Sequence, residues 1–263
     1  MKVFLTGASE GIGGATCRLL AKRAAANNDP LKIAMAASGR KPAPQKLLDD
    51  LADLGAETLF LTGDIADVAD AQRMAADAAD FCGGMDLLVS NAGGVSPGPL
   101  AELSMETWDH QFNLNVRATL VLAQALYAPL KDSAAGAIVA VASMSGIGAH
   151  LGQAAYSPAK AALISLVRNL AQEWAPDGIR VNAVSPGMVH TPLTEKVYAI
   201  PEVLAARTEM VPLNRIGRPE DIAEAIVFLG LASGGYVTGQ NLLVDGGLCD
   251  SPLGKIPGLN AIK

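Results

Sequence analysis

Short apolar segments alternate with longer helical ones along almost the whole chain, and this alternation constrains the fold more than any other feature. The apolar segments are near-continuous runs of strand-forming residues, as expected of strands that are covered on both faces. A helix between two such strands makes a unit whose strands are parallel. The seven predicted strands are Lys2–Thr6, Ile33–Ala37, Thr58–Thr62, Met85–Ser90, Ala137–Ala142, Arg180–Val184 and Asn241–Val244. The predicted helices are Ile12–Ala26, Ala43–Leu54, Val68–Ala79, Met105–Leu130, Tyr156–Trp174 and Pro219–Leu231.

No linker, internal repeat or low-complexity segment interrupts this pattern. A chain of 263 residues is long enough for one large α/β domain or for two small ones. The uninterrupted alternation favours one. We therefore expect residues 1–263 to form a single α/β domain, a doubly wound parallel seven-stranded sheet with helices on both faces (a Rossmann fold).

Charge and hydropathy exclude several classes of partner. The net charge of −6 and the pI of about 5.1 argue against nucleic acid and anionic membranes, because both bind basic patches. The apolar run at the N-terminus is too short for a signal peptide, and Gly7 interrupts it. No run of uninterrupted apolar residues is long enough to span a membrane. We expect a soluble, cytoplasmic protein.

Cysteines and histidines are scattered, without Cys-x-x-Cys or His-x-x-x-His spacing. We expect buried, reduced thiols and no metal site. The residues concerned are Cys17, Cys82, Cys249, His110, His150 and His190.

A glycine-rich turn, Thr6–Gly13, joins the first predicted strand to the first predicted helix. Glycines there let the backbone approach a pyrophosphate, whose charge free N–H groups and the helix dipole stabilise. The spacing is G-x-x-x-G-x-G, whereas the common dinucleotide fingerprint is G-x-G-x-x-G. A tight turn without a ligand therefore stays an alternative.

The same turn also reads G-x-S-x-G, the nucleophile elbow of α/β-hydrolases. Ser9, Asp177 and His190 have the chain order of a hydrolase triad. However, Ser9 follows the first strand, so no earlier strand supplies a loop for an oxyanion hole. A hydrolase is disfavoured.

The end of the second predicted strand bears on the choice of cofactor. An acid there binds the ribose 2′-hydroxyl of NAD, whereas a base accommodates the 2′-phosphate of NADP. This chain has Gly39-Arg40-Lys41 and no acid. NADP is favoured. NAD stays possible because Glu10 adds a negative charge in the glycine turn and the two bases also suit a solvated loop.

Tyr156 and Lys160 are four residues apart at the start of an apolar helix, so they share one helical face. A phenol titrates near ~10, and a neighbouring ammonium lowers its pKa. The two side chains are therefore candidates for a proton-transfer pair that acts on a hydroxyl or carbonyl group. The spacing alone is common on solvated helices and needs support from other motifs.

That support comes from ordered motifs that together resemble the short-chain dehydrogenase/reductase family over nearly the whole chain. Thr6–Gly13 resembles its T-G-x-x-x-G-I-G turn, and residues 91–93 resemble its N-A-G. Asp64-Ile65 is similar to the pair that contacts adenine, and residues 186–191 resemble the P-G-x-V-x-T beside the nicotinamide. The expected cofactor-binding residues are Gly7, Ser9, Gly11, Ile12, Gly13, Arg40, Asp64, Ile65, Asn91, Ala92, Gly93, Tyr156, Lys160, Pro186, Gly187, Val189 and Thr191.

The resemblance also implies four catalytic residues. In that assignment Tyr156 exchanges the proton, and Lys160 lowers the tyrosine pKa and holds the nicotinamide ribose. Ser143 donates to the developing oxyanion, and Asn115 holds a water that links Lys160 to solvent. Asn113 and Ser145 are the alternatives at two of these positions, and Pro158 is tolerated because it falls in the first helical turn.

The implied function is an NADP(H)-dependent oxidoreductase that transfers a hydride between nicotinamide and a small-molecule ketone or secondary alcohol. One alternative is a 3-oxoacyl-thioester reductase, because Pro212–Asp221 resembles a segment of 3-oxoacyl-carrier-protein reductases. Against it, this chain is acidic and has Gln172 in place of a cation. The other alternative is a non-catalytic dinucleotide-binding sensor, although tyrosine, lysine and serine are all retained.

The irregular segment at about 187–217 is the expected substrate lid, since a long, proline-containing connection is unusual unless it is functional. Apolar residues in it predict one short amphipathic helix, with a stripe more typical of core or interface: Leu193, Val197, Ile200 and Leu204. Residues 94–100 and 146–152 are expected at the same rim, with His150. Arg207 and Arg215 are the nearest candidates for an anionic anchor.

A homotetramer is implied by the same resemblance, built from the helices Met105–Leu130 and Ala155–Trp174 and the C-terminal strand region. The low charged fraction of 17% is consistent with buried subunit contacts. Ala159, Ala161 and Ala162 allow close helix packing. The apolar tail, residues 248–263, is expected to dock, and its role stays open.

Overall fold

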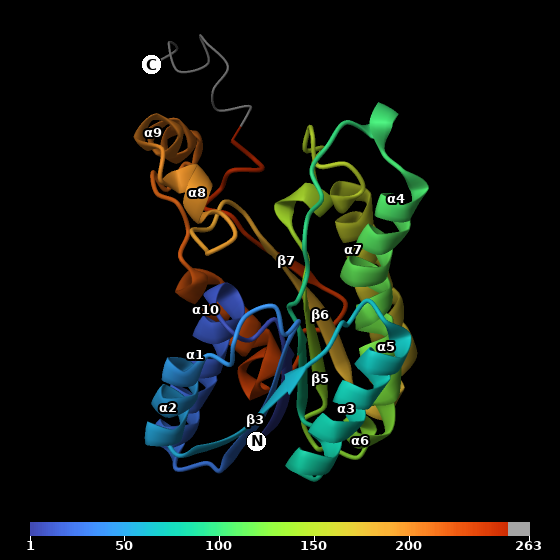
Figure 1. Ribbon diagram of the computed structural model, residues 1–263. Coiled ribbons are helices and arrows are strands. Elements are labelled where there is room, and N and C mark those ends of the chain that lie inside the picture. Colours follow the sequence, from blue (N-terminus) through green and yellow to red (C-terminus); the bar gives the residue numbers. More distant parts are fainter. Residues whose placement is uncertain (252–263) are drawn as a thin grey trace.

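The computed structural model describes residues 1–251 and is built on a seven-stranded sheet with the order β3-β2-β1-β4-β5-β6-β7 (Figure 1). Every neighbouring pair of strands is parallel. The strands are β1 (Lys2–Thr6), β2 (Leu31–Ala37), β3 (Ala56–Thr62), β4 (Leu87–Ser90), β5 (Ala137–Val141), β6 (Arg180–Pro186) and β7 (Asn241–Val244). The strand order reverses between β1 and β4, the switch point at which open α/β sheets bind ligands. The predicted fold class, a Rossmann-like doubly wound sheet, is confirmed.

Helices cover both faces of the sheet (Figure 1). One buried apolar cluster joins α1, α2 and α10 to one face, and a second joins α3, α5 and α7 to the other. Their bounds are α1 (Gly11–Asn27), α2 (Gln45–Asp53), α3 (Val68–Cys82), α5 (Ala118–Ala125), α7 (Tyr156–Trp174) and α10 (Pro219–Gly230). The other α-helices of the described chain are α4 (Met105–Phe112), α6 (Tyr127–Lys131), α8 (Glu195–Tyr198) and α9 (Pro201–Met210).

Strand residues alternate between the two clusters because successive side chains of a strand point to opposite faces. In β1, Phe4 belongs to the cluster under α3, α5 and α7, whereas Val3 and Leu5 belong to the other. All three side chains are fully buried. Burial on both faces explains why the strands read as continuous apolar runs.

The single helix predicted for Met105–Leu130 is wrong in detail. A π-helical segment, Asn113–Arg117, separates α4 from α5, and a further break at Leu126 separates α5 from α6. Pro129 lacks an N–H group, so α5 cannot continue through it with regular hydrogen bonds. The wide π turn has a local cause in the side chain of Asn115, described below.

The lid region also differs from its prediction. Two short helices, α8 and α9, replace one amphipathic helix, since Pro201 begins a new helix. Three members of the apolar stripe are exposed, namely Leu193, Ile200 and Leu204. Within α8 and α9, Tyr198 is the buried residue; its ring and that of His190 meet edge to face, and Arg207 lies over it.

Residues 252–263, most of the tail from 248 onward, lie outside the described part of the chain. Within residues 1–251 no helix combines the length and the apolar character that a membrane crossing requires.

Candidate active site

The four predicted catalytic residues come from three elements that meet at the carboxyl end of the sheet. Ser143 follows β5, Tyr156 and Lys160 lie in the first turns of α7, and Asn115 lies in the π-helical segment. Pro158 falls in the first turn of α7, as expected.

Ser143 and Tyr156 lie near enough for the serine side chain to influence the titration of the phenol. Burial raises the pKa of Tyr156 above its ordinary value, and the Ser143 side chain opposes that rise. The phenol is therefore held in its protonated form at neutral pH.

Lys160 is buried, with 3% of its surface exposed. Its ammonium donates a hydrogen bond to the carbonyl oxygen of Val141 at 2.8 Å and lies 5.7 Å from the centroid of the Tyr156 ring. Burial lowers the pKa of Lys160 to about 8. The sequence led us to expect that Lys160 lowers the tyrosine pKa. In this structure the net direction is the opposite, because burial of the phenol is the largest cause.

Asn115 is buried and ties two segments together. Its side-chain amide donates to the carbonyl oxygens of Gly94 and Gln111, both at 3.0 Å, and its carbonyl accepts from the Gly94 N–H at 3.3 Å. The bond to the Gln111 carbonyl diverts an acceptor of the helical ladder, which accounts for the π turn. Such turns are frequent at functional sites.

Gly93 lies between the Asn115 and Lys160 side chains. A Cβ atom on Gly93 would sit 2.8 Å from the Asn115 side-chain oxygen and 3.3 Å from the Lys160 nitrogen. The alternative Asn113 is half-buried at the end of α4. The geometry thus groups Asn115, and not Asn113, with the other catalytic candidates.

Ser145, the alternative to Ser143, is engaged elsewhere. Its hydroxyl pairs with the Nδ1 atom of His150 at 2.9 Å, and its N–H donates to the Ser143 hydroxyl at 3.1 Å. A pocket of about 590 Å³ lies beside this loop and is lined by residues 98–100 and 145–154, with Ser157, Pro158 and Ala161. The two loops expected at the rim therefore do meet.

The turn between β1 and α1 has the shape of a phosphate cradle. A Cβ atom on Gly13 would come within 2.1 Å of the Gly7 carbonyl oxygen, so only glycine allows this close approach. The Asn91 side-chain amide donates to the carbonyl oxygens of Thr6 and Gly7, at 3.0 Å each, which fixes the turn to the end of β4. No side chain caps the first turn of α1, so its N–H groups suit a pyrophosphate.

The other expected cofactor residues line up along the same edge. Ser9 and Ile12 flank the turn and are half-buried, and Ala92 lies next to Asn91 at the end of β4. Thr191, which follows β6, lies close to the glycine turn. A Cβ atom added to Gly11 would be 3.6 Å from the Cβ atom of Thr191. Pro186 and Val189 are buried, and Gly187 packs closely on Asp245.

At the end of β2, Arg40 and Lys41 are exposed, and Lys41 forms an ion pair with Glu10 of the glycine turn. Within residues 1–251, Arg40 has no ion-pair partner, so a cation stands free at this edge.

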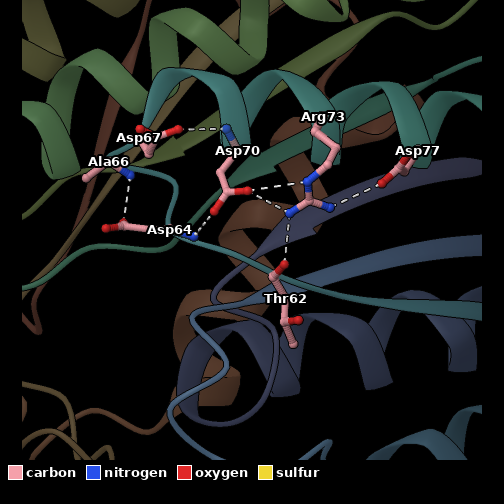
Figure 2. Close-up of polar contacts among 7 residues, drawn as sticks. All are labelled: Thr62, Asp64, Ala66, Asp67, Asp70, Arg73 and Asp77. Atoms are coloured by element: carbon pink, nitrogen blue, oxygen red, sulfur yellow. Dashed lines mark hydrogen bonds and ion pairs between the residues drawn. The ribbon is translucent and has the colours of Figure 1, made fainter.

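The loop after β3 is clamped by a polar network (Figure 2). The Asp64 N–H donates to Asp70 at 2.9 Å, and the Asp64 carboxylate accepts from the Ala66 N–H at 2.9 Å. Arg73 bridges the Thr62 carbonyl oxygen at 3.1 Å and the Asp70 carboxylate at 2.8 Å. Asp64 is thus presented at the surface, while Ile65 packs into the core.

The hydrolase triad is not assembled. Asp177 precedes β6 and binds Lys131 at 2.7 Å, whereas His190 follows β6 and pairs with Glu195 at 2.9 Å. A seven-residue strand separates the acid from the histidine, about 20 Å. Ser9 therefore has no base of this triad beside it.

Within residues 1–251, no group of three or more histidine, cysteine or acidic side chains is placed to hold a metal ion. Two groups were not predicted from the sequence: Gln111, which holds Asn115, and the Val141 carbonyl, which holds Lys160. A polar residue one helical turn before Asn115, at a buried position, was the available signal for Gln111.

This arrangement, a glycine cradle at the switch point beside a serine, a tyrosine and a lysine, defines a nicotinamide-dependent oxidoreductase. A family profile described as enoyl-(acyl carrier protein) reductase matches residues 7–249. The chain is 36% identical to the cis-4-hydroxycyclohexanecarboxylate dehydrogenase of Sinomonas cyclohexanicum, over 92% of this chain and 94% of that protein. It is also 36% identical to the glucose 1-dehydrogenase of Gluconobacter oxydans, over 94% of this chain and 91% of that protein. The chain belongs to the short-chain dehydrogenase/reductase family.

Solved structures agree with this assignment. The RhlG protein of Pseudomonas aeruginosa, in an active-site complex with NADP, matches with a TM-score of 0.85 and 30% identity, over 94% of this chain and 96% of that one. A 7α-hydroxysteroid dehydrogenase complexed with NADH matches with a TM-score of 0.85 and 29% identity, over 94% of this chain and 93% of that one. A nicotinamide cofactor is supported by both, and they differ in which one they hold.

Proposed function

We propose that this chain is an NADP(H)-dependent oxidoreductase that acts on a small-molecule ketone or secondary alcohol, with Tyr156 as general acid and base. The observation that carries the proposal is the buried ammonium of Lys160, which lies 5.7 Å from the centre of the Tyr156 ring, with Ser143 near enough to shift the tyrosine pKa. The bound nicotinamide supplies or accepts the hydride.

Tyr156 and Ser143 would handle the substrate oxygen. Ser143 lies near enough to affect the pKa of Tyr156, so both hydroxyls would reach one carbonyl oxygen. That oxygen would receive the phenolic proton while Ser143 stabilises its developing charge. With its pKa above the ordinary value, Tyr156 is protonated at neutral pH and would be the proton donor in the reduction direction.

Lys160 and Asn115 would support the tyrosine. Lys160 would hold the nicotinamide ribose, and a water on Asn115 would connect it to solvent. With its pKa lowered to about 8, Lys160 can both lose and regain a proton near neutral pH, as a relay to solvent requires.

NADP is the proposed cofactor because the end of β2 has no acid for a ribose 2′-hydroxyl and has Arg40 free at the surface. The residues assigned to the cofactor from the sequence lie along one edge of the sheet, and the glycine cradle suits its pyrophosphate.

The substrate would be a small alcohol or carbonyl compound. The relatives are named as dehydrogenases of a hydroxycyclohexanecarboxylate and of sugars. The segment 187–217, with α8 and α9, would serve as the lid of one domain formed by residues 1–263. Arg215 is held by Asp221 at 2.6 Å, which leaves it poorly suited to anchor a carrier protein.

We further propose a cytoplasmic homotetramer. Ala161 is exposed on the outer face of α7, Ala159 is buried inside the chain, and Phe228 and Tyr236 are exposed near β7 at the sheet edge. Sedimentation should give four times the chain mass of 27.0 kDa.

Oxidation of NADPH and NADH across a carbonyl panel tests the function. The panel includes ketones, keto sugars, a 3-oxoacyl thioester and a simple ester. Ketone-dependent NADPH oxidation should fall by about 10³-fold in Tyr156→Phe and by about 10²-fold in Ser143→Ala. Ser145→Ala is the matched control and should keep most of the turnover.

Each other outcome selects a different function. Preference for the thioester would indicate an acyl-thioester reductase. Ester hydrolysis that Ser9→Ala abolishes would indicate a hydrolase. Tight NADPH binding without turnover on any carbonyl would indicate a sensor.

A further inference from the structure

The ion pair between Glu10 and Lys41 joins the two loops that flank the expected position of the adenosine ribose. Glu10 lies in the turn after β1, and Lys41 lies in the loop after β2; these strands are neighbours in the sheet. Gly39, between β2 and Lys41, has a φ of +73°, a conformation that favours glycine. Both side chains stay accessible, with 64% of Lys41 and 45% of Glu10 exposed.

A 2′-phosphate and a 2′-hydroxyl would affect this pair differently. A phosphate monoester carries about −1.5 to −2 charges at pH 7. It would attract Lys41 away from Glu10 and leave the Glu10 carboxylate close to like charge. A hydroxyl carries no charge and leaves the pair intact.

Within residues 1–251, the Glu10 side chain forms no hydrogen bond or ion pair other than its pair with Lys41. It is the N-cap residue of α1, but it makes no capping hydrogen bond to the first turn. Its side-chain partner is Lys41.

We propose that Glu10 is a cofactor-specificity residue: it competes with the 2′-phosphate for Lys41 and thereby reduces the preference for NADP over NAD. The inference rests on the proposed function, in which a nicotinamide dinucleotide occupies this edge. Arg40 has no ion-pair partner within residues 1–251. It then supplies the attraction for the 2′-phosphate that Lys41 only partly provides.

Equilibrium binding of NADP and NAD to the full-length protein, measured by calorimetry without substrate, tests the inference. Glu10→Gln should lower the Kd for NADP about fivefold and leave the Kd for NAD within about twofold. Lys41→Gln should raise the Kd for NADP more in the Glu10→Gln background than in the wild type, because only there is Lys41 fully available. Lys46→Gln removes the same charge from an exposed pair with Asp50 on α2 and should change neither Kd.

The outcomes separate the two proposals. If the wild type binds neither dinucleotide, the proposed function fails. If it binds them but Glu10→Gln changes both Kd values by the same factor, or neither, only the role of Glu10 is overturned. If Glu10→Gln weakened NAD binding and left NADP binding unchanged, this result would also overturn the proposed role of Glu10. It would assign Glu10 to the ribose hydroxyl.

Discussion

The ammonium of Lys160 donates a 2.8 Å hydrogen bond to the carbonyl oxygen of Val141, at the carboxyl end of β5. Within residues 1–251, no carboxylate forms an ion pair with it. A buried lysine is thus held by one backbone acceptor, and burial lowers its pKa from 10.5 to about 8. A site that keeps such a lysine gives up folding stability for function.

Stability should therefore rise with pH above 8. Below about pH 8 both the folded and the unfolded chain carry the charge, and burying it costs free energy. Between about 8 and 10.5 the folded chain has released the proton and the unfolded chain still binds it, so the free energy of unfolding increases. Lys160→Met should remove this rise and should be more stable at pH 7 by about 2 kcal/mol, with at least ~100-fold lower kcat.

Urea unfolding at several pH values checks this prediction. Other groups, such as the buried thiol of Cys17 with a pKa raised to about 12, titrate alike in both proteins. The difference between the wild type and Lys160→Met in the pH dependence of the unfolding free energy therefore isolates the contribution of Lys160. Lys46→Met removes an exposed lysine and should keep the rise; the same pH profile for Lys160→Met and wild type would contradict the prediction.

Asn115 should matter more than Asn113 for both folding and turnover. Asn115→Ala would leave the partly buried carbonyl oxygen of Gly94 and the buried one of Gln111 without a side-chain donor, which costs about 1–3 kcal/mol. Asn113→Ala, in the same π segment, should cost less than about 0.5 kcal/mol. Chemical denaturation and steady-state kinetics on both variants measure this, and a larger effect from Asn113→Ala would show that the two roles are reversed.

Two adjacent glycines give opposite predictions. Gly13→Ala places a Cβ atom 2.1 Å from the Gly7 carbonyl oxygen, so the cradle must open, and dinucleotide affinity should fall at least ~10-fold. Gly14→Ala finds its nearest neighbour at 3.6 Å, an ordinary contact, and should stabilise the helix by about 0.5–1 kcal/mol. Calorimetric binding and thermal melting separate the two; equal loss of affinity in both would argue against a cradle at Gly13.

Much of the fold could be predicted because its signals are local. Strands buried on both faces leave continuous apolar runs, and the spacing from Ser143 to Tyr156 and Lys160 lies in the chain itself. The π segment could not be predicted in this way, because Asn113–Arg117 keeps the polarity of a regular helix. Its cause is the hydrogen bond from the Asn115 side chain to the Gln111 carbonyl oxygen, and the same side chain is also held by Gly94 on another segment.

The remaining differences between the sequence predictions and the structure depend mainly on burial and on contacts between distant segments. The pKa of Tyr156 depends on how deeply the phenol is enclosed, and the spacing to Lys160 says nothing of that. The pairing of Lys41 with Glu10 likewise depends on two loops that only the sheet brings together. The split of the lid helix had a signal in Pro201, which the apolar spacing outweighed in our interpretation.

The Arg73–Asp70 pair should hold the loop after β3 in the shape that presents Asp64 (Figure 2). Arg73→Gln removes the charged bridge from the Thr62 carbonyl oxygen to Asp70, so the Asp64 N–H should lose protection in hydrogen exchange. If this loop contacts adenine, NADP and NAD, which share that ring, should lose affinity by the same factor, about three- to tenfold.

Lowering the pH should loosen the loop after β3 in the same way as Arg73→Gln. The Arg73 hydrogen bond, followed by that from the Asp64 N–H, lowers the pKa of Asp70 below 3.8. The stabilisation is complete above that value and is lost as the pH falls through the lower, folded-state pKa. Asp77→Asn is the matched control, because Asp77 accepts at 3.3 Å from Nη1 of Arg73, a nitrogen that Asp70 does not use, and does not contact the loop. If Arg73→Gln weakened NADP alone, Arg73 would act on the 2′-phosphate and not on the loop, and unchanged exchange at Asp64 would remove the positioning role altogether.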